Sequence, residues 1–400
     1  MTFDGGALER WIPLISVDSP PSAGGVPVDG VQTNRLALAH LYMKFGWHPA
    51  PVHSFTLPLW FGGLYDEQSA ARTEAVIFDR SHLGRFYVTG EAAGRVLDGI
   101  FATSVESIPV AGLRRAVVCR EDGVVLDVAT VCHLDKGRWL VVTGPQTQSH
   151  LLGMVGAAVD DGGLMAEVEV RDRIVESVMF SVQGPKAAKL LEAIVGVTIP
   201  GAVPEGEAHE LLLGGYRALV AHTSQIGEDG YWFVVSPEVG EHFFENAVSV
   251  GITPAGLAAH DALRLEAGVL EAPYETPAPA TPAAAGLSEL VDLSGRKFPG
   301  AEALRALSGV APERVLRGVR LAGRGLAKRG NRVVFGGADG EEARGALVNA
   351  AYSAFLGASI GIAYLPAEVT SVRVDVDGEL VEAEVVAIPL VENASVRGNS

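Results

Sequence analysis

The pattern of apolar and polar residues along the first 270 positions alternates between two periods. Apolar residues at helical spacing predict helices, and short apolar or alternating runs between turn residues predict strands. Helices are expected at 35–45, 66–74, 92–100, 146–159, 185–195 and 238–250, and strands at 77–90, 139–143, 174–182, 216–222 and 232–236. The same order of elements occurs twice, which predicts an α+β fold with two successive ferredoxin-like units.

A hairpin at Arg115–Cys132 places a single carboxylate in an apolar strand. The Asp122-Gly123 pair predicts the tight turn, because such turns need a positive φ. The returning strand is apolar on both faces except for Asp127 and Thr130, which predicts a strand buried on both sides. A buried carboxylate needs a partner or a ligand, and burial raises its pKa. Asp127 is therefore either a structural residue with a polar partner or a functional one.

Beyond residue 310 the pattern changes to short alternating strands. Glycines and Pro366 divide the uncharged stretch 345–367 into pieces of strand length, which favours two buried strands over a membrane span. The Asp377-Gly378 pair predicts another hairpin, and the segment as a whole predicts a small C-terminal β-barrel.

Composition narrows the classes of function. The 400 residues include 48 acidic and 31 basic ones, for a formal charge of −17, which argues against a nucleic-acid partner. Cys119 and Cys132, near the ends of the hairpin, are not directly opposite each other and are expected to be unpaired, in a reducing compartment. We expect a cytoplasmic protein without a membrane partner, because residues 1–30 have no signal-peptide pattern. No metal site is predicted.

The expected division of the chain follows its composition. Residues 1–150 form an N-terminal α+β domain that starts with an irregular arm over 1–30, and residues 151–275 form the second α+β domain. A Pro/Ala-rich segment, 271–285, introduces a linker over 276–310. Residues 311–400 form the β-barrel.

A series of motifs, in order over most of residues 40–370, resembles the T-protein family of the glycine cleavage system. They are FGW at 45–47, EQSAARTEAVIFDRSHL at 67–83, DGVVLD at 122–127, VQGP at 182–185, GEDGY at 227–231, GLAAHDALRLEAG at 256–268, FPGAEAL at 298–304 and YSAFLGASIGIAYLP at 352–366. The family writes corresponding segments such as F-D-V-S-H-M and G-L-x-A-R-D. The resemblance implies a three-domain cloverleaf around a central channel that holds tetrahydrofolate.

The resemblance also implies roles for single residues. Asp127 matches the acid that faces the pterin and manages protons, and it becomes the candidate catalytic residue. The other positions expected near the cofactor mostly depart from the family pattern; they are Leu83, Arg114, Gln225, Glu228, Tyr231, Trp232 and His260. Trp232 stands where the family has a pterin-binding Glu, and His260 where it has an Arg near the folate tail.

Three functions stay open at this point. The resemblance implies an enzyme that transfers a methyl or aminomethyl group, or removes a methyl group, on a small molecule with tetrahydrofolate as cofactor. A second hypothesis is an enzyme of the same fold that uses the channel for other acid–base chemistry without folate. A third is a non-catalytic ligand-binding protein. The sequence contains no feature that supports a carrier-protein partner.

Overall fold

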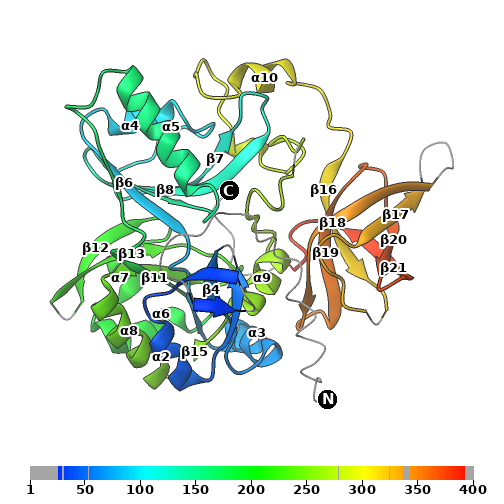
Figure 1. The fold of residues 1–400 in the computed structure, drawn as a ribbon, viewed down its shortest axis with the longest axis horizontal. Coiled ribbons are helices and arrows are strands. Elements are labelled where there is room, and N and C mark those ends of the chain that lie inside the picture. The colour runs from blue at the N-terminus through cyan, green and yellow to red at the C-terminus, as the bar shows by residue number, and fades with distance from the viewer. Residues whose placement is uncertain are drawn as a thin grey trace.

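The structure is a computed structural model that describes residues 26–28, 31–52, 54–213, 215–277, 279–323, 325–336 and 342–391. Figure 1 shows three lobes around a common centre: a lobe with α4 and α5, a lobe with α6 and α8, and a barrel built from β16 to β21. The α+β class and the C-terminal barrel are therefore confirmed. The expected arm over 1–30 lies mostly outside the described residues, and Val26–Val28 forms a short strand, β1.

The first lobe is a five-stranded sheet with two helices on one face. Its strand order is β10 (Glu169–Asp172), β6 (Gly84–Thr89), β9 (Arg138–Thr143), β8 (Val125–Asp135) and β7 (Leu113–Cys119). Helices α4 (Ala93–Asp98) and α5 (Gln148–Asp161) pack on this sheet. Val96 of α4 and Leu151 of α5 share one buried core with Trp139 of β9. Burial of these apolar side chains is the main term that stabilises the lobe.

The predicted hairpin is present as β7 and β8, which pair antiparallel around Gly123 at a φ of 79°. Cys119 lies opposite Val125 and Cys132 opposite Leu113, and both cysteines are buried and unpaired, as expected. The prediction that both faces of the returning strand are buried is wrong. Its alternate residues, among them Val128 and Thr130, are only half-buried because a cavity lies on that side.

The second lobe contains a six-stranded sheet, a small four-stranded sheet and most of the helices. The larger sheet has the order β12 (Ala208–Leu213), β13 (Tyr216–His222), β14 (Gly230–Val235), β11 (Val178–Gln183), β5 (Val76–Asp79) and β15 (Thr253–Pro254). The smaller has the order β1, β2 (Val31–Arg35), β4 (Phe55–Trp60) and β3 (His48–Val52). The helices are α2 (Ala39–Tyr42), η2 (Met43–Phe45), α3 (Leu64–Thr73), α6 (Ala187–Val195), α7 (Ile199–Ala202), α8 (Pro237–Ser249) and α9 (Leu257–Glu266).

The two large sheets exchange strands across residue 150. Strand β5 precedes that position but pairs with β11 in the six-stranded sheet, and β10 follows it but pairs with β6 in the five-stranded sheet. Each of the two lobes thus contains a strand from the other half of the chain. The division of the chain at 150, 275 and 310 stays a prediction.

The third lobe is a closed barrel of six strands in the order β16 (Val315–Leu321), β19 (Ala358–Leu365), β18 (Glu342–Ser353), β17 (Arg332–Gly336), β20 (Ser371–Val376) and β21 (Glu379–Val386). The uncharged stretch 345–367 forms most of β18 and all of β19, so the prediction of two strands is confirmed. Strand β19 is buried along most of its length, whereas β18 is buried only in part, with Ala346 exposed. In the described part of the chain, no helix has the length and apolar character needed to cross a membrane.

The segment between α9 and the barrel packs tightly against its neighbours. It contains η3 (Ser288–Leu290) and α10 (Ala301–Ala306), and its Leu287 and Phe298 join a core with Val117 of β7 and Ile360 of β19. This core connects the hairpin to the barrel and so positions the wall of the cavity.

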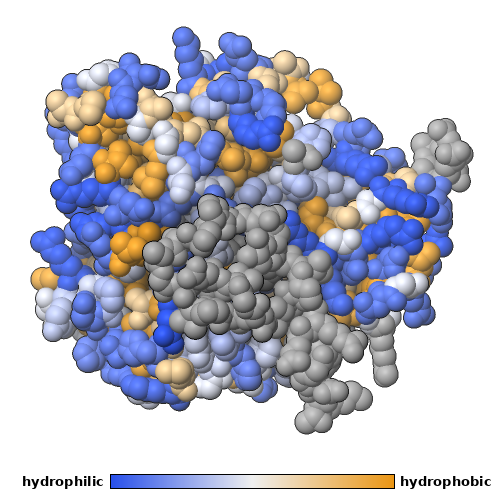
Figure 2. Space-filling view, viewed as in Figure 1, coloured by the Kyte–Doolittle hydropathy of each residue, from blue (hydrophilic) through white to orange (hydrophobic). Residues whose placement is uncertain are grey.

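Figure 2 shows a viewed face that is mostly hydrophilic over its described residues, with hydrophobic residues in separate groups.

Candidate active site

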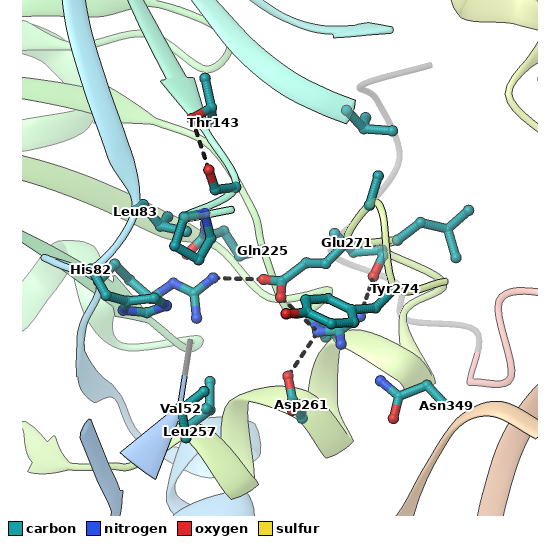
Figure 3. Close-up of a pocket in the computed structure, with 18 of the residues that line it drawn as sticks. Val52, His82, Leu83, Thr143, Gln225, Leu257, Asp261, Glu271, Tyr274 and Asn349 are labelled. Atoms are coloured by element: carbon teal, nitrogen blue, oxygen red, sulfur yellow. Dashed lines mark hydrogen bonds and ion pairs between the residues drawn. The ribbon is translucent and has the colours of Figure 1, made fainter. Parts of the chain in front are cut away.

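A cavity of about 220 Å³ lies where the three lobes meet. Its wall includes residues of the hairpin, of the turn between β9 and α5, of β14, of α9 and of the segment that follows α9. Two residues of the barrel strand β18 also contribute. Figure 3 shows side chains from these elements pointing toward a shared space. The volume is below the roughly 300–1,000 Å³ typical of sites for drug-sized ligands, so a longer ligand would extend from its mouth.

Asp127 is buried in this wall at 1% exposure. Its Oδ1 accepts a hydrogen bond from the Val128 N–H at 2.7 Å, and its Oδ2 accepts bonds from the Gly144 N–H at 3.3 Å and the Thr147 hydroxyl. Burial raises the pKa of Asp127 to about 6, although the three hydrogen bonds act in the opposite direction. A carboxylate with this pKa exists in both protonation states near neutral pH, as acid–base chemistry requires.

Strand β9 brings the partners of Asp127 to it. The strand runs beside β8 and ends at Thr143, after which the chain turns through Gly144 and enters α5 at Gln148. The turn places the Gly144 N–H and the Thr147 hydroxyl on one oxygen of the carboxylate. A carboxylate offers about four acceptor positions, so three hydrogen bonds leave about one for a ligand or a proton.

Three of the other predicted residues line the same cavity: Leu83, Gln225 and Trp232. Leu83 and Trp232 belong to one apolar cluster. The Gln225 Oε1 and the Trp232 Nε1 are buried, and neither has a hydrogen-bond partner among the described residues. A buried polar atom without a partner costs free energy, so an acceptor and a donor left open on one cavity wall indicate a ligand with polar edges.

Arg114 and Tyr231 lie outside this cavity because side chains alternate along a strand. Arg114 donates a hydrogen bond to Ser107 at 2.9 Å, and its neighbour Arg115 lines the cavity instead. Tyr231 is fully buried in the core on the other face of β14, where it stacks on His222 with ring centroids 4.3 Å apart.

Glu228 also lies away from the cavity. Its carboxylate forms an ion pair with Arg72 at 2.7 Å, and Arg72 bonds Glu266 of α9 through its other nitrogen. All three side chains are at most 10% exposed. Glu228 therefore connects α3 to the loop before β14, and this contact holds the fold together and does not face the cavity.

His260 faces the interior behind the cavity rather than the cavity itself. Its ring packs edge-on against Phe78, and its Nδ1 lies 3.3 Å from a guanidinium nitrogen of Arg80. Burial and the nearby Arg80 lower the pKa of His260 to about 4, so the imidazole is neutral at physiological pH. On α9, the neighbouring Asp261 and Arg264 line the cavity in its place.

A network of charged residues forms the opposite wall, and sequence reasoning missed it. Arg80 pairs with Glu271 at 2.6 Å, and Arg264 pairs with Glu275 at 2.7 Å and with Asp261 at 2.9 Å. Both Glu271 and Asp261, labelled in Figure 3, lie beside the guanidinium of Arg264. Arg264 and Arg80 lower the pKa of Glu271 well below its ordinary value, so this carboxylate stays ionised.

Part of this network was visible in the sequence. Arg80 stands within FDRSHL, where the family pattern has an apolar residue. A cation at the end of an apolar strand indicates a buried polar partner, because arginine is rarely buried unless it is paired. Glu271 and Glu275 stand in the Pro/Ala-rich segment whose composition predicts the start of a linker. Glu275 is fully buried and also accepts a hydrogen bond from the Asn349 amide at 2.6 Å.

A cavity between three lobes, with a buried titratable carboxylate and unpartnered polar atoms, is typical of an enzyme that binds a small polar molecule. The comparison with known families is more specific. The GCVT N-terminal domain matches residues 36–295, and the glycine cleavage T-protein C-terminal barrel domain matches residues 314–392. The chain belongs to the glycine cleavage T-protein family, and the predicted resemblance is confirmed.

Individual relatives agree with the family. An aminomethyltransferase of Symbiobacterium thermophilum is 31% identical over 367 residues, which cover 89% of this chain and 96% of the relative. An aminomethyltransferase of Streptomyces avermitilis is 32% identical over 368 residues, with the same two coverages. These relatives and the family confirm the expectation of a transferase.

A solved structure also supports the fold. The crystal structure of the glycine cleavage system aminomethyltransferase T from Bartonella henselae has a TM-score of 0.82 to this chain. It is 21% identical and covers 92% of this chain and 100% of its own length.

Proposed function

We propose that the protein is an aminomethyltransferase-like enzyme that transfers a one-carbon unit between a small molecule and tetrahydrofolate bound in the Asp127 cavity. Family membership and the names of the relatives support the transferase class. The observation that carries the assignment to this cavity is the position of Asp127, a buried carboxylate with a pKa of about 6 in the wall of a cavity between three lobes.

The residues present fit a reduced pterin ring. Such a ring carries hydrogen-bond donors and acceptors on its edge, and the cavity offers the unpartnered Gln225 Oε1 and Trp232 Nε1. Leu83 and Trp232 supply apolar and aromatic surface for a planar molecule. Gln225 and Trp232 would therefore hold the ring, although the acidic contact that the family resemblance implies at position 232 is replaced here by an indole.

The chemistry divides between the cofactor and the chain. Bound tetrahydrofolate would supply ring nitrogens that carry the one-carbon unit. Asp127 would hold a proton on its free acceptor position, or take one from a ligand nitrogen, because its pKa lies near neutrality. The half-buried hairpin residues and the segment after α9 exclude water and hold the ligands in position, which lowers the entropic part of the barrier.

A titration of the purified protein with tetrahydrofolate, followed by calorimetry, tests the cofactor assignment. We expect a dissociation constant in the micromolar range or weaker, roughly −8 kcal/mol or less favourable, because the acidic pterin contact is replaced. Absence of both heat and thermal stabilisation at millimolar tetrahydrofolate would favour the alternative of a folate-independent enzyme. The family comparisons do not favour that alternative.

A further inference from the structure

The loop between β13 and β14 supplies three consecutive residues to the cavity wall: Thr223, Ser224 and Gln225. The last bond between the two strands joins the Thr223 N–H to the Gly230 carbonyl at 2.9 Å. Beyond it, the loop carries the Gln225 side chain, labelled in Figure 3, whose Oε1 has no hydrogen-bond partner among the described residues. Loops are more mobile than the strands they connect. The direction of this open acceptor therefore depends on the contacts that hold the loop.

The side chain of Gln183, at the end of β11, holds this loop without lining the cavity itself. Its Nε2 donates a hydrogen bond to the Thr223 carbonyl at 3.2 Å, and its Oε1 accepts one from the Gln225 N–H at 3.0 Å. The Nε2 also donates to the Ser181 hydroxyl at 3.0 Å. Gln183 is fully buried, so these hydrogen bonds are made away from solvent, where an unmade one costs most.

The amide group of Gln183 meets two opposite demands of the loop. The Gln225 N–H requires an acceptor, whereas the Thr223 carbonyl requires a donor, and an amide offers both side by side. An ionised carboxylate has no donor, and a methionine of similar length has neither group. The facing strand also leaves room for the amide, because a Cβ on Gly230 would lie 2.2 Å from its atoms.

The hydrogen bond to Gln183 is the direct restraint on position 225. Among the described residues, the Gln225 main chain has no other hydrogen bond. Further along, the Gly227 N–H bonds the Ser224 hydroxyl at 3.1 Å, and the Ile226 carbonyl accepts a bond from Arg72 at 3.1 Å. These contacts lie on the far side of residue 225. A functional side chain is held in its productive direction by such supporting hydrogen bonds.

We propose that Gln183 is a positioning residue that directs the Gln225 amide to the ring of the bound cofactor. This inference rests on the proposed function, because tetrahydrofolate is its ligand. Gln183 acts through Gln225, by holding the backbone on both sides of Ser224. Without these two hydrogen bonds the Gln225 amide is still present, but ligand binding has to order the loop, and this ordering lowers the affinity.

The test is a double-mutant cycle on tetrahydrofolate affinity, measured by calorimetry at pH 7.5. Gln183→Met and Gln225→Leu should each weaken binding by roughly 2- to 10-fold, the range for one neutral hydrogen bond. Because the first acts through the second, the double variant should bind no more weakly than the weaker single variant. The same cycle of Gln183→Met with Trp232→Phe should give the product of the two losses, because the Trp232 backbone is held by the pairing of β14 with β11.

Two further variants separate positioning from stability. Ser181→Ala removes one hydrogen bond of the same buried amide but neither contact to the loop, and it should bind tetrahydrofolate like wild type. Gln183→Glu keeps the length of the side chain and serves also if Gln183→Met does not fold. A protonated carboxyl can make both loop contacts, whereas an ionised one loses the donor. Relative to wild type at the same pH, this variant should bind nearly normally at pH 6 and more weakly at pH 8.5.

Each other outcome overturns a defined part. Equal affinity in wild type and Gln183→Met overturns the inference and leaves the proposed function intact. Losses that multiply in the cycle with Gln225→Leu, or a loss in Gln183→Met without one in Gln225→Leu, show that Gln183 does not act through Gln225. The inference is also wrong if Ser181→Ala loses as much as Gln183→Met, or if the relative affinity of Gln183→Glu is independent of pH. If wild type does not bind tetrahydrofolate, both the proposed function and the inference are wrong.

Discussion

The two walls of the cavity hold their carboxylates in opposite ways. On the hairpin wall, Asp127 has hydrogen-bond donors but no cation within ion-pair distance among the described residues, and its pKa rises to about 6. On the α9 wall, Glu271 lies beside Arg80 and Arg264, and its pKa falls well below the ordinary value. Burial thus leaves Asp127 titratable on one wall and Glu271 ionised on the other. The difference between these two carboxylates comes from the cations around each group. Glu275, which is also part of the α9 network, has a raised pKa, because its burial outweighs the effect of Arg264.

The two walls are expected to serve different functions. A group that changes protonation near neutral pH can take part in proton transfer, whereas a permanently paired charge can position ligands and hold the fold. The α9 wall is expected to control stability and the hairpin wall to control turnover.

The largest expected effect is on the α9 wall. Replacing Arg264 by Leu leaves the fully buried Glu275 without its cation, and breaking such a buried pair costs ~3–5 kcal/mol. Chemical denaturation should show this loss in the free energy of unfolding. The control is Arg320→Leu, which removes an ion pair whose two side chains are about half exposed and should cost at most ~1 kcal/mol. Equal losses in the two variants would show that the α9 network does not stabilise the fold.

A second effect concerns pH on the hairpin wall. Folding raises the pKa of Asp127 from 3.8 to about 6. The contribution of this group to the free energy of unfolding is therefore largest below pH 4 and is lost as the pH rises through 6. The shift of about two units corresponds to on the order of 3 kcal/mol. The difference in unfolding free energy between wild type and Asp127→Asn should therefore change in favour of the variant from pH 4 to pH 7. Turnover of wild type should rise with pH through about 6 where Asp127 takes a proton from the ligand, and fall over the same range where it donates one. A pH-independent stability difference would contradict the raised pKa.

The smallest effects concern the unpartnered polar atoms. Trp232→Phe and Gln225→Leu each remove one open hydrogen-bonding atom, and each should weaken tetrahydrofolate binding by roughly 2- to 10-fold, the range for one neutral hydrogen bond. Tyr231→Phe is the matched control, because its hydroxyl is also buried and unpartnered among the described residues but lies outside the cavity. Calorimetry of the three variants decides this prediction. A loss in Tyr231→Phe as large as in Trp232→Phe would mean that the effect is general and not a ligand contact.

The sequence predicted the hairpin wall well and the α9 wall poorly, for physical reasons. Turn chemistry and alternation identified β7, β8 and the burial of Asp127, because these depend on local backbone geometry. Alternation also makes an error of one residue move a side chain to the other face, which is why Arg114 was expected where Arg115 lies.

The residues of the α9 wall depend on tertiary contacts. Glu271 and Glu275 stand in a segment whose composition is typical of a linker, yet Arg80 and Arg264, distant in sequence or on a neighbouring helix, hold them in place. The exchange of β5 and β10 between the two large sheets is likewise a property of long-range pairing that no local pattern contains. The helix expected at 35–45 begins only at Ala39, because Arg35 ends strand β2.

The central claim is that Asp127 serves catalysis rather than the fold, and the Asp127→Asn variant tests it most directly. Asn is nearly the same size and keeps one acceptor oxygen for the Thr147 hydroxyl, but it cannot exchange a proton. At pH 7.5, turnover and melting temperature are measured on the same preparation. The account predicts turnover at least ~100-fold lower, the usual scale for loss of an acid–base group, with a melting temperature equal to or above that of wild type. Normal specific activity with a melting temperature several degrees lower would show that Asp127 is a structural residue.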